Sequence, residues 1–249
     1  MVICTRSRTA ERTESLMPEN FPLLRGTLPA IAIDGPAGVG KSSVGKEAAA
    51  RLGWKFIDTG AMYRSLALVV SEKKLPQEKW EEVMTGLDIR FVPGENNQRV
   101  FIGEREVTKA IRTPEITAQV KYAADHPGVR RAARALQKKL AADGNVVMEG
   151  RDICQFVLPD ARYKFFLDAS LEARIERRVK QLADDGIHAD PAEVATAMAK
   201  RDEEDRKRDI APLTPSPDVF YIDNTHLTKH EVVEFIISLV EADRAANAG

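Results

Sequence analysis

The residues with the most specific chemistry lie at positions 35–42, where GPAGVGKS matches the pattern G-x-x-x-x-G-K-[ST] in full. Glycines let the backbone curl so that successive N–H groups point at phosphate oxygens. Lys41 would reach the β- and γ-phosphates of a nucleoside triphosphate, and the Ser42 hydroxyl would ligate Mg²⁺. The predicted triphosphate-binding residues are Gly35, Pro36, Ala37, Gly38, Val39, Gly40, Lys41, Ser42 and Ser43.

The segments around this loop have the periodicity that such a site needs. An apolar strand at 30–34 precedes the loop and a helix at 42–52 follows it, so the positive end of the helix would add to phosphate binding. A glycine-rich turn that binds nothing is the alternative, but it does not explain the full motif in its full context. Further strands alternate with helices down the chain, at 55–58, 145–149, 163–169 and 219–224. This alternation predicts an α/β fold with a parallel core sheet flanked by helices.

One region departs from this alternation. The segments LDIRFVPG and RVFIGEREV alternate apolar and polar residues around a PGENN turn, which predicts a small antiparallel hairpin inserted into the core. Two helical stretches follow between 113 and 142, separated at 125–128. Two charge-rich helices are expected at 171–185 and from 191 to about 208, and an amphipathic helix at the end of the chain.

The composition excludes several classes of function. Lys and Arg number 37 against 38 Asp and Glu, for a net charge of −1, which argues against a general nucleic-acid coat. Two cysteines and four scattered histidines provide neither a disulfide framework nor metal-ligand spacing. The first 28 residues lack the apolar core of a secretory signal, and no apolar run approaches a membrane span. We expect a cytoplasmic protein without membrane or nucleic-acid partners, and a flexible extension at 1–28.

The phosphate-binding loop alone does not choose among kinases, motors, GTPases and ABC-type ATPases. A GTPase would carry an Asn-Lys-x-Asp motif, and none is present; no ABC-type signature is visible either. Segments that contain arginines after the loop distinguish among these classes. The segments DTGAMYR (58–64), EGRDI (149–153) and RDEEDRKRDIAPL (201–213), in this order after the loop, resemble the bacterial cytidylate kinase family.

The resemblance, which covers the chain from Pro29 onward, implies a P-loop nucleoside monophosphate (NMP) kinase fold with an NMP-binding insertion and a helical lid. It implies transfer of the γ-phosphate of ATP to CMP or dCMP with Mg²⁺, by a protein expected to be a monomer. We expect the kinase domain at 29–249, with its core at 29–63 and 114–249, the insertion at about 64–113 and the lid at about 171–192. The implied catalytic residues are Lys41, Arg151, Arg174 and Arg178.

The same resemblance implies an acceptor site. Arg64, Arg151, Arg201 and Arg208 would bind the acceptor phosphate, because the planar guanidinium group binds phosphate in a bidentate way and keeps its charge. Each of these arginines has surface ion pairing as its alternative role. The remaining implied CMP-binding residues are Thr59, which would lie beside the nucleotide, Arg130 and Asp152, which would read the base, and Asp205, which would hold the sugar hydroxyls.

The reading of the base follows from hydrogen-bond chemistry. An Asp that accepts from cytosine N4, beside an Arg that donates to N3 or O2, complements cytosine and opposes uracil. An internal salt bridge or helix cap is the alternative role of Asp152. Two positions depart from the family: Lys121 stands where a small hydroxyl residue is usual near the base, and Cys154 replaces a glycine after GRDI. Cys154 is expected to be a packed, inert thiol.

The predicted lid rests on three arginines. Arg174, Arg177 and Arg178 stand at i, i+3 and i+4 of one helix, so they share a face that could cover ATP. A salt-bridged surface helix is the alternative, because Glu172 and Glu176 lie among them. A UMP or AMP kinase, and a nucleotide switch without phosphoryl transfer, remain open alternatives for the function. An acceptor panel would separate the kinases, and the absence of any diphosphate product would favour the switch.

Overall fold

The chain divides into two compact units. The computed structural model describes residues 24–94, 98–184, 186–208 and 210–247, so most of the predicted extension at 1–28 lies outside the described residues. Unit 1 comprises the chain up to Lys55 and from Gly144 onward, and unit 2 is Phe56–Asp143. The predicted NMP insertion at 64–113 falls within the residues of unit 2, and its bounds remain a prediction.

The core sheet has five strands in the order β2-β6-β1-β7-β8. Strand β1 pairs in parallel with β6 and with β7, and β7 pairs in parallel with β8. The boundary between the units falls within β2, the edge strand. The strand bounds are Leu28–Asp34 for β1, Lys55–Asp58 for β2, Val146–Gly150 for β6, Ala161–Asp168 for β7 and Phe220–Asp223 for β8. The predicted parallel sheet is confirmed.

Apolar residues on both faces of the central strands make the core. Residues 30–33 of β1 have no exposed surface, as expected for a central strand covered on both faces. The rings of Phe165 and Phe220 lie 5.5 Å apart, and Phe235 packs edge-on against both. The carboxyl ends of β1, β6 and β7 are therefore supported by a packed apolar core. They lie at the edge of the sheet where ligands bind in such folds.

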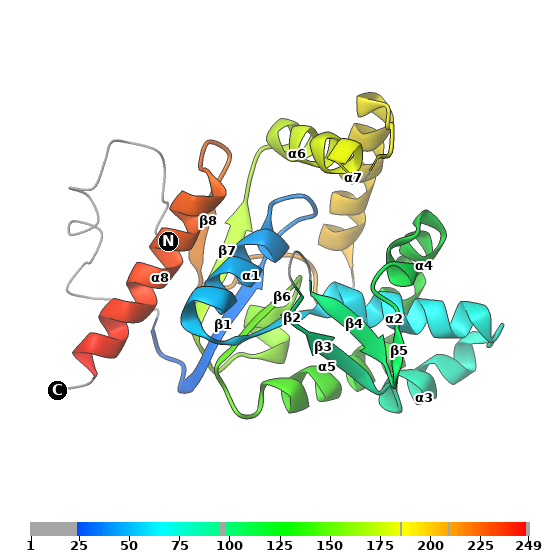
Figure 1. Ribbon diagram of the computed structural model, residues 1–249, viewed down its shortest axis with the longest axis horizontal. Helices are drawn as coiled ribbons and strands as arrows, with labels where there is room; N and C mark the ends of the chain where they lie inside the picture. Colours follow the sequence, from blue (N-terminus) through cyan, green and yellow to red (C-terminus); the bar gives the residue numbers. More distant parts are fainter. Residues whose placement is uncertain (1–23, 95–97, 185, 209, 248–249) are drawn as a thin grey trace. The chain divides into compact units, whose positions relative to one another are not determined.

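Among the described residues, four α-helices of unit 1 accompany this sheet: α1 (Lys41–Leu52), α6 (Leu171–Asp184), α7 (Pro191–Lys207) and α8 (Lys229–Ala246). Helices α1 and α8 lie side by side, as do α6 and α7 (Figure 1). Helix α8 begins with a capping box in which Thr228 and Glu231 satisfy each other's backbone amides. No described helix is long and apolar enough to cross a bilayer.

Unit 2 combines helices with a small antiparallel sheet. Its helices are α2 (Thr59–Glu72), α3 (Trp80–Thr85), α4 (Pro114–Asp125) and α5 (Pro127–Ala141). Strands β3 (Ile89–Val92), β4 (Arg99–Ile102) and β5 (Arg105–Glu106) form the sheet. The antiparallel pairing of the predicted hairpin is confirmed, whereas residues 95–97 of its PGENN turn lie outside the described residues. The expected second strand is divided in two at Gly103, which adopts a φ of 56°. Helix α3 was not anticipated, because its six residues are too few to display a helical period.

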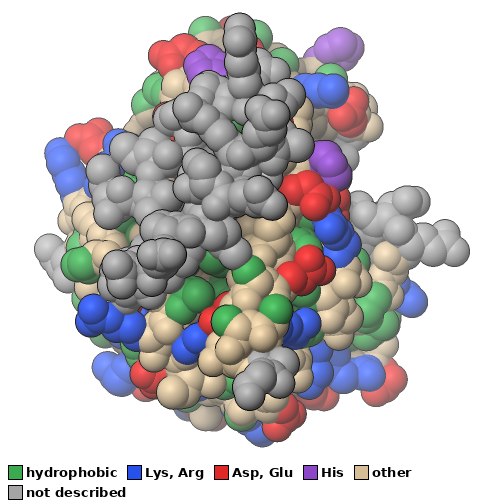
Figure 2. Space-filling model, turned by 90° about the vertical axis from the view of Figure 1, so that its left-hand side faces the viewer, with side chains coloured by type: hydrophobic (Ala, Val, Ile, Leu, Met, Phe, Trp, Pro, Cys, Tyr) green, Lys and Arg blue, Asp and Glu red, His purple; other side chains and the backbone are tan. Residues whose placement is uncertain are grey.

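Charged side chains of both signs are visible on one face of the molecule. On the face shown in Figure 2, Lys and Arg side chains lie near Asp and Glu side chains at several places outside the grey atoms. This mixing agrees with the near-zero net charge. Strong positive fields must therefore be built locally, from arginines that particular elements place together.

Candidate active site

The phosphate-binding loop joins β1 to α1 in unit 1. Gly38 and Gly40 have φ values of 74° and 98°, which L-amino acids with side chains rarely adopt. Gly35 also needs to be glycine, because a Cβ atom there would lie 2.1 Å from the Leu167 carbonyl oxygen. The loop ends at the first turn of α1, whose free amides and positive end favour an anion. All nine predicted triphosphate-binding residues, 35–43, belong to this loop and first turn.

Lys41 is the first residue of α1 and points back along the loop. Its side chain is only 5% exposed, and its Nζ donates to the Pro36 carbonyl at 2.7 Å. Burial lowers the pKa of Lys41 to about 7; the charge of Arg151 acts in the same direction and that of Glu149 against it. A triphosphate placed here would favour the charged ammonium form.

Glu149 is a candidate site residue that sequence reasoning missed. The Ser42 hydroxyl donates to a carboxylate oxygen of Glu149, which sits on β6 beside Ile33 of β1. The pair therefore places a hydroxyl and a carboxylate together beside the phosphate-binding loop. These are the hard oxygen ligands that Mg²⁺ prefers. The position of Glu149, near the carboxyl end of a buried strand directly before GRD, was the available signal.

Asp34 connects the phosphate-binding loop to the GRD segment. Its two carboxylate oxygens accept hydrogen bonds from the amides of Ile153 and Cys154, at 2.9 and 2.8 Å. Burial raises the pKa of Asp34 to about 6 even though these amides oppose the shift. Cys154 is buried, and burial likewise raises the pKa of its thiol, as expected for a packed, unreactive cysteine. Asp152 lies directly before this anchored turn.

Arg151 and Arg208 share one buried carboxylate. Arg151 Nε donates to Asp205 Oδ2 at 3.0 Å, and Arg208 Nη2 lies 2.6 Å from Oδ1. Asp205 is only 2% exposed; burial raises its pKa, but the charges of Arg151, Arg208 and Arg201 outweigh burial and hold that pKa below its ordinary value. The charge of Arg201 also helps to lower the pKa of Lys41. Unit 1 thus gathers three of the predicted acceptor arginines beside the phosphate-binding loop.

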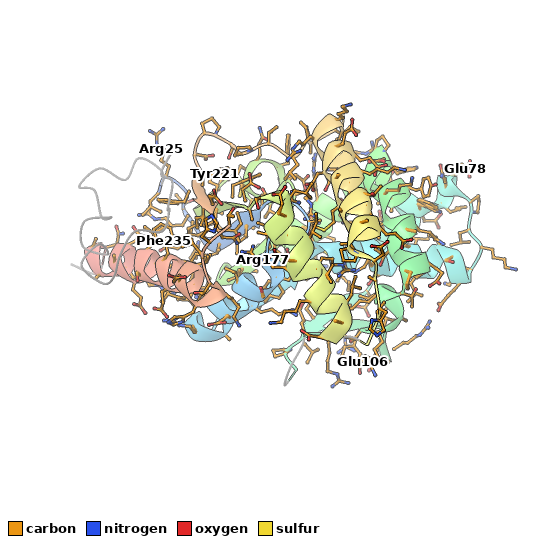
Figure 3. The ribbon with its side chains drawn as sticks, turned by 90° about the horizontal axis from the view of Figure 1, so that it is seen from above. Arg25, Glu78, Glu106, Arg177, Tyr221 and Phe235 are labelled. Carbon is orange, nitrogen blue, oxygen red and sulfur yellow. The ribbon has the colours of Figure 1, made fainter. Side chains whose placement is uncertain are left out.

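The predicted lid arginines occupy three different environments. Arg174 is 3% exposed: it donates from Nε to Ala169 O and from Nη1 to Ala37 O, both at 3.1 Å, and its Nη2 lies 2.7 Å from buried Asp202. Arg177, labelled in Figure 3, extends from α6 and donates to the Asn224 side chain at 2.9 Å. Arg178 is hydrogen-bonded to Gln181. In this structure Arg174 therefore supports the backbone of the phosphate-binding loop.

The other predicted acceptor residues lie in unit 2. Thr59 is the buried first residue of α2, and Arg64, on the next turn, donates from Nη2 to Asp58 Oδ2 at 2.8 Å. Arg130, on α5, is buried and donates from Nη1 to Ala124 O at 2.9 Å. Lys121 lies 5.0 Å from the centre of the Tyr122 ring. Asp58 is a second residue that sequence reasoning missed, although it stands in the quoted DTGAMYR segment.

Comparison with known proteins identifies the family. The family model described as "Cytidylate kinase" matches residues 31–242. A "Cytidylate kinase" of Exiguobacterium sibiricum is 46% identical over 214 residues, covering 85% of this chain and 96% of that protein. The chain belongs to the cytidylate kinase family. A further member, from Bacillus cereus, is 43% identical over 213 residues, covering 84% of this chain and 95% of the relative.

The family match covers the candidate residues of unit 1 and those of unit 2, from the phosphate-binding loop to Arg208. It confirms the predicted family and fold class. The solved structure of an uncharacterized protein from Eubacterium ventriosum shares the fold, with a TM-score of 0.51 at 13% identity, covering 87% of this chain and 99% of that one. That likeness concerns the fold alone.

Proposed function

We propose that this protein transfers the γ-phosphate of ATP to CMP or dCMP, giving CDP or dCDP and ADP. The proposal rests mainly on the arrangement within unit 1, where the charges of Arg151 and Arg201 act on the buried Lys41 of the phosphate-binding loop, and where Asp205 pairs with both Arg151 and Arg208. The names of the relatives support the choice of acceptor. The protein would act as a cytoplasmic monomer.

The reaction needs no general base. The second pKa of a phosphate monoester is about 6, so the acceptor oxygen is largely ionised at neutral pH. That oxygen attacks the γ-phosphorus in line, the bond between the γ-phosphorus and the bridging oxygen breaks, and ADP leaves with the bonding electrons. The protein has to bring two anions together, and Lys41 with the arginine groups would offset their repulsion.

Mg²⁺ fits the oxygen pair at the loop. Ser42, held by Glu149, would ligate the ion directly, and Glu149 would hold it through the Ser42 hydroxyl or a water molecule. When bound, the ion would neutralise charge on the donor phosphates. We propose that Arg178, and Arg174 through the loop backbone, contribute from the lid at about 171–192.

The acceptor phosphate has four proposed contacts. Arg151, Arg201 and Arg208 would bind the phosphate of CMP, as would Arg64 in the proposed insertion at 64–113. Asp205, whose carboxylate already orients two of these arginines, would also meet the sugar hydroxyls, with Thr59 beside the nucleotide. Asp152 and Arg130 would read the cytosine edge, because they supply an acceptor opposite N4 and a donor opposite N3 or O2.

A panel of acceptors tests this proposal. With Mg·ATP, CMP and dCMP should be converted to diphosphates with kcat/KM values at least tenfold above those for UMP and AMP. Chromatography of the products measures all four reactions in parallel. A preference for UMP or AMP would refute the base-reading role of Asp152 and Arg130. ATP binding without any diphosphate product would refute the kinase proposal as a whole.

Proton uptake should accompany ATP binding, because of Lys41. The free side chain has a pKa of about 7, and the triphosphate would raise that pKa by favouring the ammonium form. Binding at pH 8 should therefore take up close to one proton, and ATP affinity should fall as the pH rises above about 7. Isothermal titration calorimetry in two buffers of different ionisation enthalpy measures this uptake. Lys41→Arg should abolish it, and equal uptake by both proteins would contradict the assignment.

A further inference from the structure

Asp58 of unit 2 holds two arginines on one carboxylate oxygen. Its Oδ1 accepts from the Ala61 amide at 2.9 Å and so caps α2. Its Oδ2 lies 2.8 Å from Arg64 Nη2 and 3.8 Å from Arg112 Nη2. Arg64 belongs to the proposed acceptor site, whereas Arg112 is not among the residues that the sequence predicts for it. The carboxylate therefore joins two guanidinium groups that are far apart in the sequence.

The charges in this cluster do not balance. Two guanidinium groups face one carboxylate, whose pKa is held below its ordinary value because the two arginines and the Ala61 amide outweigh the opposing effect of burial. Arg112 also stands directly before Thr113, the N-cap of α4, where a helix favours negative charge. An anion bound beside Arg64 and Arg112 would balance the excess positive charge.

Both arginines retain unused hydrogen-bond donors. The Nε of Arg64 is buried and has no hydrogen-bond partner among the described residues, a condition that is costly unless a ligand supplies an acceptor. Arg112 lies within ion-pair range of Asp58 but beyond hydrogen-bond distance, and its side chain is 44% exposed. Its donors therefore remain available to a molecule arriving from outside.

Gly60 provides the space that the Arg64 side chain occupies. A Cβ atom at position 60 would lie 3.0 Å from Arg64 Nη1 and 3.0 Å from Asp58 Oδ1. An alanine there would thus press on both members of the ion pair. The glycine lets Arg64 fold back over the first turn of α2 onto the carboxylate that it shares with Arg112.

We propose that Arg112 is a second residue of unit 2 that contacts the acceptor phosphate, held beside Arg64 by the shared carboxylate of Asp58. This inference rests on the proposed function and extends its acceptor site. A phosphate monoester carries nearly two negative charges at neutral pH and offers three acceptor oxygens. Asp58 is a positioning residue, and Gly60 leaves room for the arrangement.

Arg112→Ala is the direct test. The KM for CMP should rise about 10- to 100-fold, the range expected for the loss of a charged hydrogen bond, while the KM for ATP stays unchanged. Arg112→Lys should restore part of the loss, because it keeps the charge without the planar fork. Arg105→Ala is the matched control, since Arg105 is an exposed arginine of unit 2 paired with Glu72. An unchanged KM for CMP in Arg112→Ala would overturn the proposal.

Cytidine separates phosphate contact from structural support. Cytidine carries the base and sugar without phosphate, so its inhibition constant, measured in competition with CMP, should be the same for the wild type and for Arg112→Ala. An equal weakening of cytidine and CMP would overturn the phosphate role. A wild type that fails to phosphorylate CMP would instead refute the proposed function, so the two failures are distinguishable.

Asp58 and Gly60 provide independent checks on positioning. In a double-mutant cycle on the KM for CMP, Asp58→Asn and Arg112→Ala should be non-additive, because both disturb one arrangement; strict additivity would contradict the positioning role of Asp58. Gly60→Ala should raise that KM without lowering the melting temperature, since alanine is the better helix former. Gly86→Ala, whose Cβ would meet only an ordinary contact at 3.6 Å, is the control. Equal KM values for the two glycine variants would contradict the proposal.

Discussion

Arg151→Ala should lower kcat/KM for CMP by about 30- to 1000-fold while leaving ATP binding nearly intact. The lower and upper limits correspond to about 2 and 4 kcal/mol of lost transition-state stabilisation, the usual cost of removing one preorganised donor from a developing anion. Arg151 is suited to this role because Asp205 holds its Nε and the Gly150 carbonyl accepts from its Nη1, leaving Nη2 to reach a phosphate. Steady-state kinetics with CMP as the variable substrate would measure the loss.

Arg151→Ala should not weaken the binding of ATP. The charge of Arg151 helps to lower the pKa of Lys41, so its removal should raise that pKa and favour the ammonium form that binds phosphate. ATP affinity at pH 8 should therefore hold or improve slightly. Lys207→Ala, which removes an exposed cation of α7 paired with Glu203, is the matched control and should change neither substrate. A parallel loss of ATP and CMP binding would mean that Arg151 mainly supports the fold.

Asp205→Asn should be the second most damaging change, although in this proposal it acts chiefly through its neighbours. The carboxylate orients Arg151 and Arg208 at once, whereas an amide offers only one acceptor oxygen and turns an NH₂ group toward a guanidinium. Loss of charge-assisted hydrogen bonds of this kind corresponds to a fall in kcat/KM for CMP of about 10- to 100-fold. The same substitution leaves mostly buried positive charge uncompensated, and should cost about 3 kcal/mol of unfolding free energy.

The stability effect of Asp205 has its own pH dependence. Because the pKa is lowered in the folded state, the carboxylate stabilises the fold above its unfolded pKa of about 3.9, and this contribution is lost as the pH falls through the folded value. The difference in unfolding free energy between wild type and Asp205→Asn should therefore be largest near neutral pH and shrink in acid. Glu203→Gln, an exposed carboxyl-to-amide change on the same helix, should show almost no difference. If Asp205→Asn and Glu203→Gln changed the unfolding free energy equally at each pH, the stabilising role of the buried Asp205 carboxylate would be contradicted.

The phosphate-binding loop could be predicted in full because its chemistry is local. Glycines at fixed spacing, a lysine and a hydroxyl residue are all read within eight positions, and the flanking strand and helix have clear periods. The parallel core sheet was equally accessible, since buried strands such as β1 are continuous apolar runs. The family resemblance then placed the acceptor residues in order along the chain, although their contacts remain a proposal.

Other features depend on contacts that no local pattern encodes. Glu149 meets Ser42 only because β6 pairs with β1 in one particular register. The shared face of Arg174, Arg177 and Arg178 follows from the helical period, but that period does not say that Arg174 turns inward to donate to the Ala37 carbonyl. Likewise Asp58 caps α2 from the position just before the helix, but only the fold places Arg112 beside that carboxylate.

A crystal structure of the protein with CMP and a non-hydrolysable ATP analogue would show directly whether the two phosphate groups meet as proposed. We expect Lys41 Nζ and the loop amides to lie about 3 Å from the donor phosphate oxygens, at hydrogen-bond distance. We also expect the guanidinium groups of Arg151 and Arg208 to contact the acceptor phosphate, which faces the γ-phosphorus in line. If both nucleotides were well ordered while these arginines faced solvent away from either phosphate, the proposed phosphoryl transfer would be refuted.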